Sequence, residues 1–143
     1  MYTKILVGTD GSETAAEAVR QAGELARLHG AELIVLHGAK TTASGVSGGG
    51  MYAAPVDLES IRTAAEEILQ QAQSSLGEDS KVRTIFREGD PAEAILDAAE
   101  EEGADLIVVG NRGMRGAKRF LLGSVPNRVA HHAPCSVLIV HTT

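Results

Sequence analysis

The sequence predicts an α/β protein, with an open, mostly parallel sheet of five strands and helices on both faces. Short apolar runs alternate with longer segments in which apolar residues recur at helical spacing. Most of these runs lack polar alternation, which is typical of parallel strands that helices cover on both sides. A length of 143 residues, with 43% hydrophobic and 3% aromatic residues, fits one aliphatic core. We therefore expect a single domain over residues 1–143.

The apolar runs predict strands at residues 5–7, 33–36, 82–86, 106–109 and 137–140. Helical spacing predicts four helices between them, which end near Gly30, Gly77, Gly103 and His132. The third helix has a clear start, because Asp90, Pro91 and Glu93 match an N-cap, an N1 proline and an N3 glutamate. Residues 41–50 are rich in glycine and have no apolar periodicity, so we expect a flexible connection over about 41–55 rather than a sheet element.

Two of the predicted strands have features of sheet edges. Residues 82–86 mix charged and apolar side chains, which favours an edge over a central position. The strand Val137–Val140 is entirely apolar and is the last predicted strand in the chain. Because an uncovered apolar edge tends to pair, we expect a homodimer in which this strand meets its copy. The alternative is that it lies inside the sheet or under a loop.

Charge and composition exclude several classes of protein. The formal net charge of −6 divides into −11 on residues 1–105 and +5 on residues 106–143, which favours an anionic ligand near the last third. A nucleic-acid surface is disfavoured, because the acidic remainder would repel a long phosphate backbone. No apolar run approaches the roughly 18 residues of a membrane span. One cysteine and no apolar leader indicate a cytoplasmic protein.

One loop has the pattern of a phosphate cradle. It reads Gly110-Asn111-Arg112-Gly113, then nine residues, then Gly123-Ser124. Glycines without a Cβ, and able to adopt positive φ, let backbone N–H groups close on a polyanion. Ser124 lies where the last helix begins, so its hydroxyl is expected to serve as the N-cap beside the positive end of the helix dipole. The pattern predicts an anion site between a strand and a helix.

A second part of this site is expected at the end of the first strand. In open α/β sheets, ligands bind beyond the carboxyl ends of the strands, where the strand order reverses. Thr9 and Asp10 follow the first strand, and Val109 and Gly110 end the fourth. If these strands flank the reversal, both ends face one crevice. Alternatively, Asp10 only caps the first helix, because Asp10-x-x-Glu13 is itself a capping-box pattern. His37 is interpreted as a hydrogen-bonded core histidine.

The chain resembles the ATP-binding branch of the universal stress protein superfamily over essentially its whole length. The resemblance rests on residues 4–12, on Gly89-Asp90-Pro91, on residues 105–110 and on the spaced glycine loop. It implies a Rossmann-like sheet of order 3-2-1-4-5, a dimer through the fifth strand, and ATP between the first and fourth strands.

The resemblance also implies roles for single residues. Asp10 is expected near the ribose and adenine, Gly110 and Gly113 along the ribose and phosphates, and Gly123, Ser124 and Val125 along the phosphates. Gly38 departs from the family, in which a valine often contacts adenine, so Ala39 or the loop beyond it is expected to fill the gap. The candidate site is Thr9, Asp10, Gly38, Val109, Gly110, Arg112, Gly113, Gly123, Ser124 and Val125.

Binding without efficient hydrolysis is the leading hypothesis. The chain has no Walker-type lysine, and no glutamine or carboxylate in the loop to position an attacking water. We therefore expect a cytoplasmic, ATP-binding stress-response module that senses nucleotide and changes a surface for an unidentified protein partner. Mg²⁺ or Mn²⁺ would arrive with the phosphates. The alternatives are a slow ATPase, a protein that phosphorylates itself on Ser124 or a nearby hydroxyl, and a nucleotide-free scaffold.

Overall fold

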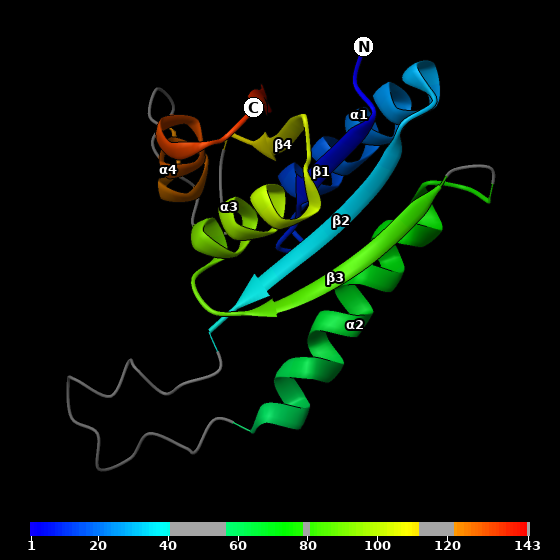
Figure 1. The fold of residues 1–143 in the computed structure, drawn as a ribbon. Helices are drawn as coiled ribbons and strands as arrows, with labels where there is room; N and C mark the ends of the chain where they lie inside the picture. The colour runs from blue at the N-terminus through cyan, green and yellow to red at the C-terminus, as the bar shows by residue number, and fades with distance from the viewer. Residues whose placement is uncertain (41–56, 79–80, 112–121, 143) are drawn as a thin grey trace.

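The computed structural model describes residues 1–40, 57–78, 81–111 and 122–142. In this part of the chain, five parallel strands form one sheet in the order β3-β2-β1-β4-β5 (Figure 1). The elements are β1 (Lys4–Gly8), α1 (Glu13–His29), β2 (Glu32–Ala39), α2 (Leu58–Ser75), β3 (Val82–Glu88), α3 (Pro91–Glu102), β4 (Leu106–Gly110), α4 (Ser124–His132) and β5 (Ser136–Val140). The predicted fold class, strand order and element order are confirmed. The connection expected at residues 41–55 lies outside the described residues.

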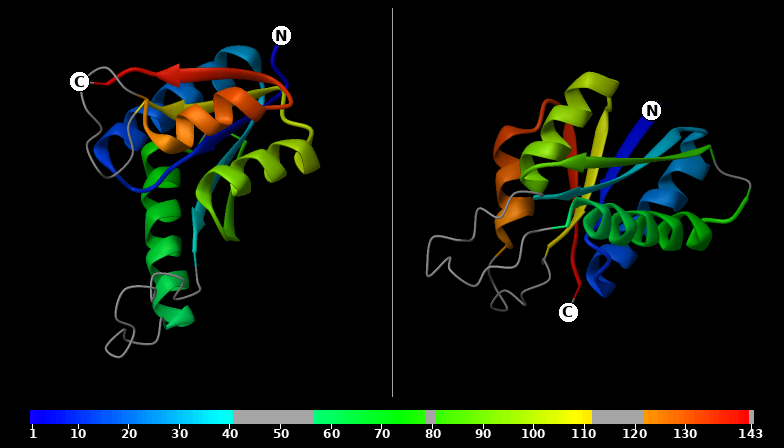
Figure 2. Two further views of the ribbon diagram at one scale, coloured as in Figure 1. Left: turned by 90° about the vertical axis from the view of Figure 1, so that its left-hand side faces the viewer. Right: turned by 90° about the horizontal axis from the view of Figure 1, so that it is seen from below.

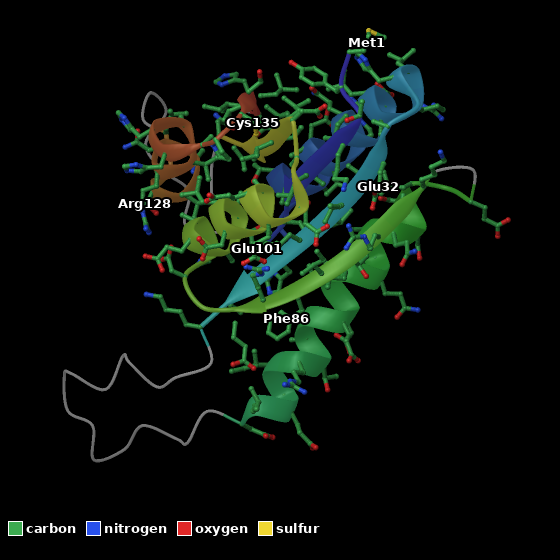
Figure 3. All side chains as sticks on the ribbon, viewed as in Figure 1. Met1, Glu32, Phe86, Glu101, Arg128 and Cys135 are labelled. Atoms are coloured by element: carbon green, nitrogen blue, oxygen red, sulfur yellow. The ribbon has the colours of Figure 1, made fainter. Side chains whose placement is uncertain are left out.

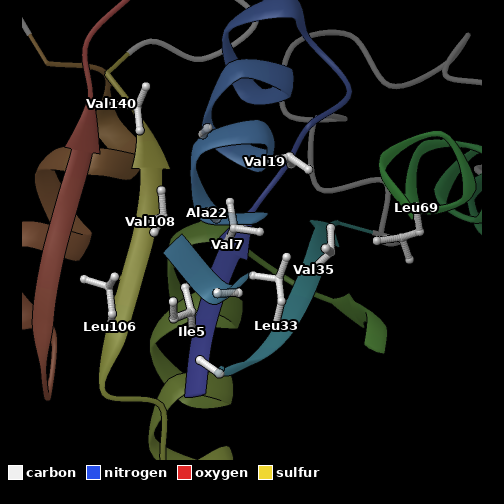
Figure 4. Close-up of a cluster of buried hydrophobic side chains, with 13 residues drawn as sticks. Ile5, Val7, Val19, Ala22, Leu33, Val35, Leu69, Leu106, Val108 and Val140 are labelled. Atoms are coloured by element: carbon white, nitrogen blue, oxygen red, sulfur yellow. The ribbon is translucent and has the colours of Figure 1, made fainter. Parts of the chain in front are cut away.

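The sheet is the middle of three layers. Helices α1 and α2 cover one face, and α3 and α4 cover the other (Figure 2). Ile5 and Val7 of β1 pack in the α1/α2 layer, which Figure 4 shows, whereas Leu6 packs in the α3/α4 layer. All three side chains have no exposed surface. Burial on both faces explains why the first strand is apolar at every position.

Local signals in the sequence account for most helix ends. Gly30 and Gly103 end α1 and α3 in the left-handed conformation, with φ of 64° and 70°. Asp90 caps α3 by accepting a hydrogen bond from the Glu93 N–H, as predicted. The capping alternative for Asp10 is wrong, because Ser12 caps α1 through the Ala15 N–H. Ser12 is closer to the first helical turn, so its hydroxyl reaches the free N–H group.

The edge positions of β3 and β5 are also confirmed. Ion pairs join the polar edge strand β3 to its neighbours. Arg83 contacts Glu32 at 3.0 Å and Glu102 at 2.5 Å, and Arg87 pairs with Glu101 of α3 (Figure 3). Hydrogen bonds to these carboxylates raise the pKa of Arg83 and of Arg87. At the other edge, β5 leaves Val137, Leu138 and Ile139 partly exposed, and its pairing with a second copy stays a prediction.

Within the described ranges, no helix combines the length and apolar character needed to cross a lipid bilayer.

Asp105 holds the beginnings of β1 and β4 together at the end of the sheet away from the glycine loop. Its carboxylate accepts hydrogen bonds from the Thr3 N–H at 2.8 Å, the Thr3 hydroxyl at 3.0 Å and the Lys4 N–H at 3.1 Å. Burial raises the pKa of Asp105, but these hydrogen bonds outweigh it and bring the pKa below the ordinary value of 3.8. The ionised carboxylate therefore stabilises the pairing of the two central strands.

We expect Asp105→Asn to lower the free energy of unfolding at pH 7 by about 1–2 kcal/mol, because one charged acceptor is lost. The folded pKa of Asp105 lies below its unfolded value, so its contribution is present above about pH 4 and is lost as the pH falls through the folded pKa. The difference between wild type and variant should therefore shrink in acid. Urea unfolding between pH 7 and pH 3 measures this, with the exposed Asp97→Asn as control. A constant difference across that range contradicts the assignment.

Candidate functional site

A cavity of about 600 Å³ lies at the carboxyl ends of the strands, where the strand order reverses between β1 and β4. Eight of the ten candidate residues line it: Thr9, Asp10, Gly38, Val109, Gly110, Gly123, Ser124 and Val125. Arg112 and Gly113 lie outside the described residues. The structure therefore brings the end of the first strand, the end of the second and the start of the last helix to one hollow.

Apolar side chains from both helical layers form the walls of the cavity. Ala15 and Ile68 contribute from α1 and α2, and Pro91 and Ile95 from α3. At Gly8 a Cβ would lie 2.6 Å from the Ile95 Cδ1 atom, so α3 packs closely against the end of β1. Sequence reasoning missed these wall residues, because their apolar character is the same as that of the core.

The start of α4 differs from the prediction at two positions. Gly123, not Ser124, is the N-cap, and Ser124 is the first residue of the helix. Gly123 has φ −61° and ψ 165°, a conformation open to any residue, so positive φ is not the reason for glycine here. The Ser124 hydroxyl is therefore not used as a helix cap, and it has no hydrogen-bond partner among the residues that the structure describes.

Two backbone donors remain free at the start of α4. Asn127 N–H bonds to Gly123 O at 3.1 Å, and Pro126 has no N–H. The N–H groups of Ser124 and Val125 have no partner among the described residues. With the Ser124 hydroxyl, they form a set of three donors at the positive end of the helix dipole. Such a set binds a phosphate or another small anion.

Asn111 closes the glycine loop and was not among the candidate residues. Its backbone carbonyl accepts the Gly123 N–H at 3.0 Å, which joins the two ends of the loop. Its Oδ1 accepts hydrogen bonds from the Thr142 N–H at 2.9 Å and the Thr142 hydroxyl at 3.0 Å. These donors set the orientation of the amide, so Nδ2 donates to His141 Nδ1 at 3.1 Å. Asn111, which is 6% exposed, thus anchors the loop to the segment after β5.

Asp10 faces the cavity from the turn after β1. Its Oδ1 accepts the Ser12 N–H at 2.9 Å, and the Thr9 hydroxyl accepts the Gly11 N–H at 3.1 Å. These two bonds fix the turn locally. The second carboxylate oxygen of Asp10 has no partner in the described part of the chain. It is therefore an available acceptor at the cavity.

The end of β2 presents a free donor and a free acceptor. In a parallel strand, the N–H and C=O of alternate residues point to the same neighbour. On the β1 side, the Glu32 N–H donates to the Thr3 carbonyl at 3.0 Å, and the Leu36 carbonyl accepts the Thr9 N–H at 2.9 Å. The backbone N–H and C=O groups of the even-numbered residues of β2 therefore face β1. Gly38 continues this series but lies beyond the last strand residue of β1. Its N–H and C=O therefore face the segment that follows β1, beginning with Thr9, and have no partner in the described part.

Packing against α3 explains why residue 38 is a glycine. A Cβ at this position would lie 3.0 Å from the Ala94 Cβ and 3.1 Å from the Pro91 Cα. The first turn of α3 already occupies the space where a side chain would be. Ala39, which was expected to fill the gap beside Gly38, also lines the cavity, and the loop beyond it lies outside the described residues.

Charged groups near the cavity are mostly paired. Arg128 of α4 contacts Asp90 at 2.7 Å and Glu93 at 3.4 Å, and so ties α4 to the start of α3. Burial raises the pKa of Asp90, but the Glu93 N–H bond and Arg128 together outweigh it and lower the pKa. Over the described ranges, no group of three or more His, Cys, Asp or Glu side chains is placed to hold a metal ion.

The chain is thus an α/β protein with a cavity at the switch point of a parallel sheet. The universal stress protein family model matches residues 1–141. Universal stress protein YxiE of Bacillus subtilis is 38% identical, over 98% of this chain and 99% of that protein. The chain therefore belongs to the universal stress protein family.

Two solved structures of this kind contain adenine nucleotides. One is a universal stress protein in complex with cAMP, with a TM-score of 0.71 and 33% identity over 99% of this chain and 98% of that chain. The other is the universal stress protein of Archaeoglobus fulgidus in complex with dAMP, with a TM-score of 0.68 and 30% identity over 96% of this chain and 97% of that chain.

We expect Asn111→Ala to destabilise the protein by about 1–3 kcal/mol, because the Thr142 N–H loses its acceptor. The loss should be concentrated at the site: amide exchange of Gly123 and Thr142 should accelerate more than that of the central strands. Hydrogen exchange followed by NMR measures both amides. Thr142→Val, which removes only one hydroxyl donor, serves as the milder control. Uniform acceleration across the sheet would contradict a local role for Asn111.

Proposed function

We propose that this protein binds ATP in the cavity at the β1/β4 switch point and acts as a nucleotide-gated regulatory module in the stress response. The observation that carries the proposal is that two sets of free backbone groups lie at the same cavity. The Ser124 and Val125 N–H groups suit an anion, and the Gly38 N–H and C=O suit a planar base. The complexes of related proteins with cAMP and dAMP support an adenine nucleotide as the ligand class.

Gly38 is suited to the edge of adenine. Adenine offers an acceptor at N1 next to a donor at its 6-amino group, which is complementary to one N–H and one C=O. Guanine has the opposite arrangement at these two positions, so it would place donor against donor and acceptor against acceptor. Such a mismatch leaves buried polar groups unpaired, which discriminates strongly between bases. The apolar walls formed by Ile68, Pro91 and Ile95 suit the faces of the ring.

The sugar and phosphates have partners on the other elements. The free oxygen of Asp10 is suited to a ribose hydroxyl, the role that acidic residues have in other nucleotide-binding α/β folds. The three donors of Ser124 and Val125 would hold one phosphate group, and Gly110, Arg112 and Gly113 would complete the cradle. Mg²⁺ or Mn²⁺ would be bound mainly through the phosphate oxygens, because Mg²⁺ keeps much of its water and is commonly held by phosphates.

Regulation rather than turnover is the proposed role. Asp10 is the only carboxylate among the described residues that line the cavity, and it is placed for the sugar. Occupancy by ATP would order the 110–124 loop, which Asn111 links to the segment after β5. We propose that the protein works in the cytoplasm as a homodimer through Val137–Val140, and that this coupling changes a surface for a protein partner.

Loss of a phosphate donor should weaken binding of ATP. We expect Ser124→Ala to reduce ATP affinity roughly tenfold, because a hydrogen bond to a charged group contributes about 1.5–3 kcal/mol. Titration calorimetry in Mg²⁺ measures this, with Thr63→Ala on the exposed face of α2 as control. Mass spectrometry of nucleotide released from denatured protein gives an independent readout. If the wild type neither carries nor binds an adenine nucleotide, the proposed function is wrong and the scaffold alternative returns.

Hydrolysis should be far slower than in working enzymes. We expect single-turnover assays with labelled ATP to show rates well below about 1 s⁻¹, because no described group at the cavity is placed to activate a water. Radiolabel retained on the protein after denaturation would identify autophosphorylation, and its loss in Ser124→Ala would locate it. Turnover near 1 s⁻¹ would favour the ATPase alternative over the regulatory module.

A further inference from the structure

The backbone ladder between β1 and β2 stops one step earlier than its pattern allows. Successive N–H groups of β2 donate to carbonyls of β1 two residues apart, beginning with Glu32 N–H to Thr3 O. In this register the next donor after Leu36 is the Gly38 N–H, and its acceptor would be Thr9 O. That bond is not formed. Thr9 O instead accepts a hydrogen bond from the His37 side chain at Nδ1, over 2.8 Å.

The chemistry of this contact defines the protonation of the imidazole. A carbonyl oxygen only accepts hydrogen bonds, so the proton lies on Nδ1 of His37. The ring is held in place from the neighbouring strand, because His37 and Phe86 are register partners of β2 and β3. Their ring centroids are 6.1 Å apart with planes inclined by 22°, a stacked arrangement. Phe86, which Figure 3 labels, in turn packs against the core cluster of the α1/α2 layer.

We propose that His37 is a positioning residue for the nucleobase, which keeps the Gly38 N–H free by holding the Thr9 carbonyl toward its own ring and out of the strand ladder. The proposal rests on the proposed function, in which Gly38 pairs with adenine. The imidazole donates in place of the backbone amide, so the turn after β1 keeps its carbonyl satisfied while the strand ladder stays open. A donor on the side chain of residue 37 thus determines whether residue 38 can recognise a base.

Neighbouring groups agree with this role. Thr9 is 9% exposed, so its carbonyl lies in a site where an unpaired acceptor would be costly. The other hydrogen bonds of this turn, from Gly11 N–H to the Thr9 hydroxyl and from Ser12 N–H to Asp10, leave the Thr9 carbonyl to His37. His37, Gly38 and Thr9 all line the cavity. Without a donor at residue 37, the Gly38 N–H is the nearest backbone group in register to replace it.

Two variants separate the donor from the ring. His37→Phe keeps an aromatic ring beside Phe86 but removes the donor, whereas His37→Asn places an amide N–H close to the position of Nδ1. In the free protein, we expect amide exchange of Gly38 to be fast in wild type and in His37→Asn, and slow in His37→Phe because the ladder extends. Hydrogen exchange followed by NMR measures this without any ligand.

Base selectivity supplies the second measurement. ATP and ITP differ at positions 1 and 6 of the purine, the two positions that would face Gly38. We expect wild type and His37→Asn to prefer ATP, and His37→Phe to bind ATP about tenfold more weakly with a lower ATP/ITP ratio. Affinity for inorganic triphosphate should be unchanged in all three, because the start of α4 is not altered. A merely structural role of His37 would change all three affinities together.

The outcomes are separable from those of the proposed function. A Gly38 amide already protected in free wild-type protein would overturn the proposal without any variant, and so would unchanged Gly38 exchange and unchanged ATP/ITP ratio in His37→Phe. If wild type fails to bind ATP, the proposed function is wrong, while the exchange of Gly38 still decides whether His37 holds the ladder open. Loss of folding in His37→Phe leaves the wild-type and His37→Asn measurements to decide.

Discussion

The site depends on one constraint, which is that buried backbone N–H and C=O groups need hydrogen-bond partners. Where one parallel strand extends beyond its neighbour, the neighbour has no residues left to provide these partners. Strand β1 ends at Gly8, but β2 continues to Ala39 on one side of it. The extra residues of β2 therefore face a space that no strand fills. This mismatch at the reversal of strand order creates the cavity, and it leaves polar groups of the backbone directed into it.

Other contacts determine which of these groups are free. The Asn111 carbonyl accepts the Gly123 N–H, and the His37 ring donates to the Thr9 carbonyl. The Ser12 N–H donates to one carboxylate oxygen of Asp10. The groups left over are a donor and an acceptor at Gly38, one carboxylate oxygen at Asp10, and the donors at the start of α4. Most of the unpaired polar groups at the cavity, among the described residues, thus belong to the backbone. Backbone groups are rigidly placed by the sheet and helix, so little ordering is needed when a ligand binds.

The surrounding structure keeps these groups at fixed positions. Arg128 ties α4 to the start of α3 through Asp90 and Glu93, and α3 packs closely on Gly8 and Gly38. At the opposite end of the sheet, Asp105 joins the beginnings of β1 and β4. The two strands that flank the cavity are therefore held at both ends, and a backbone hydrogen bond joins Asn111 to Gly123 beside it.

The sequence alone determined the fold class, the order of elements and the polar and glycine part of the cavity lining, because apolar periodicity, glycines and capping residues are local signals. The edge position of β3 followed from its mixed polar residues, and that of β5 from its place as the last strand of the chain. Only the tertiary structure decided that Gly123 rather than Ser124 caps α4, that Ser12 rather than Asp10 caps α1, and that α3 packs tightly against Gly38. It also gave His37 and Asn111 their roles, since Thr9 and Thr142 lie 28 and 31 residues away from them. Partners so distant in the chain leave no periodic or local signal, and only the packed sheet brings them within hydrogen-bond distance.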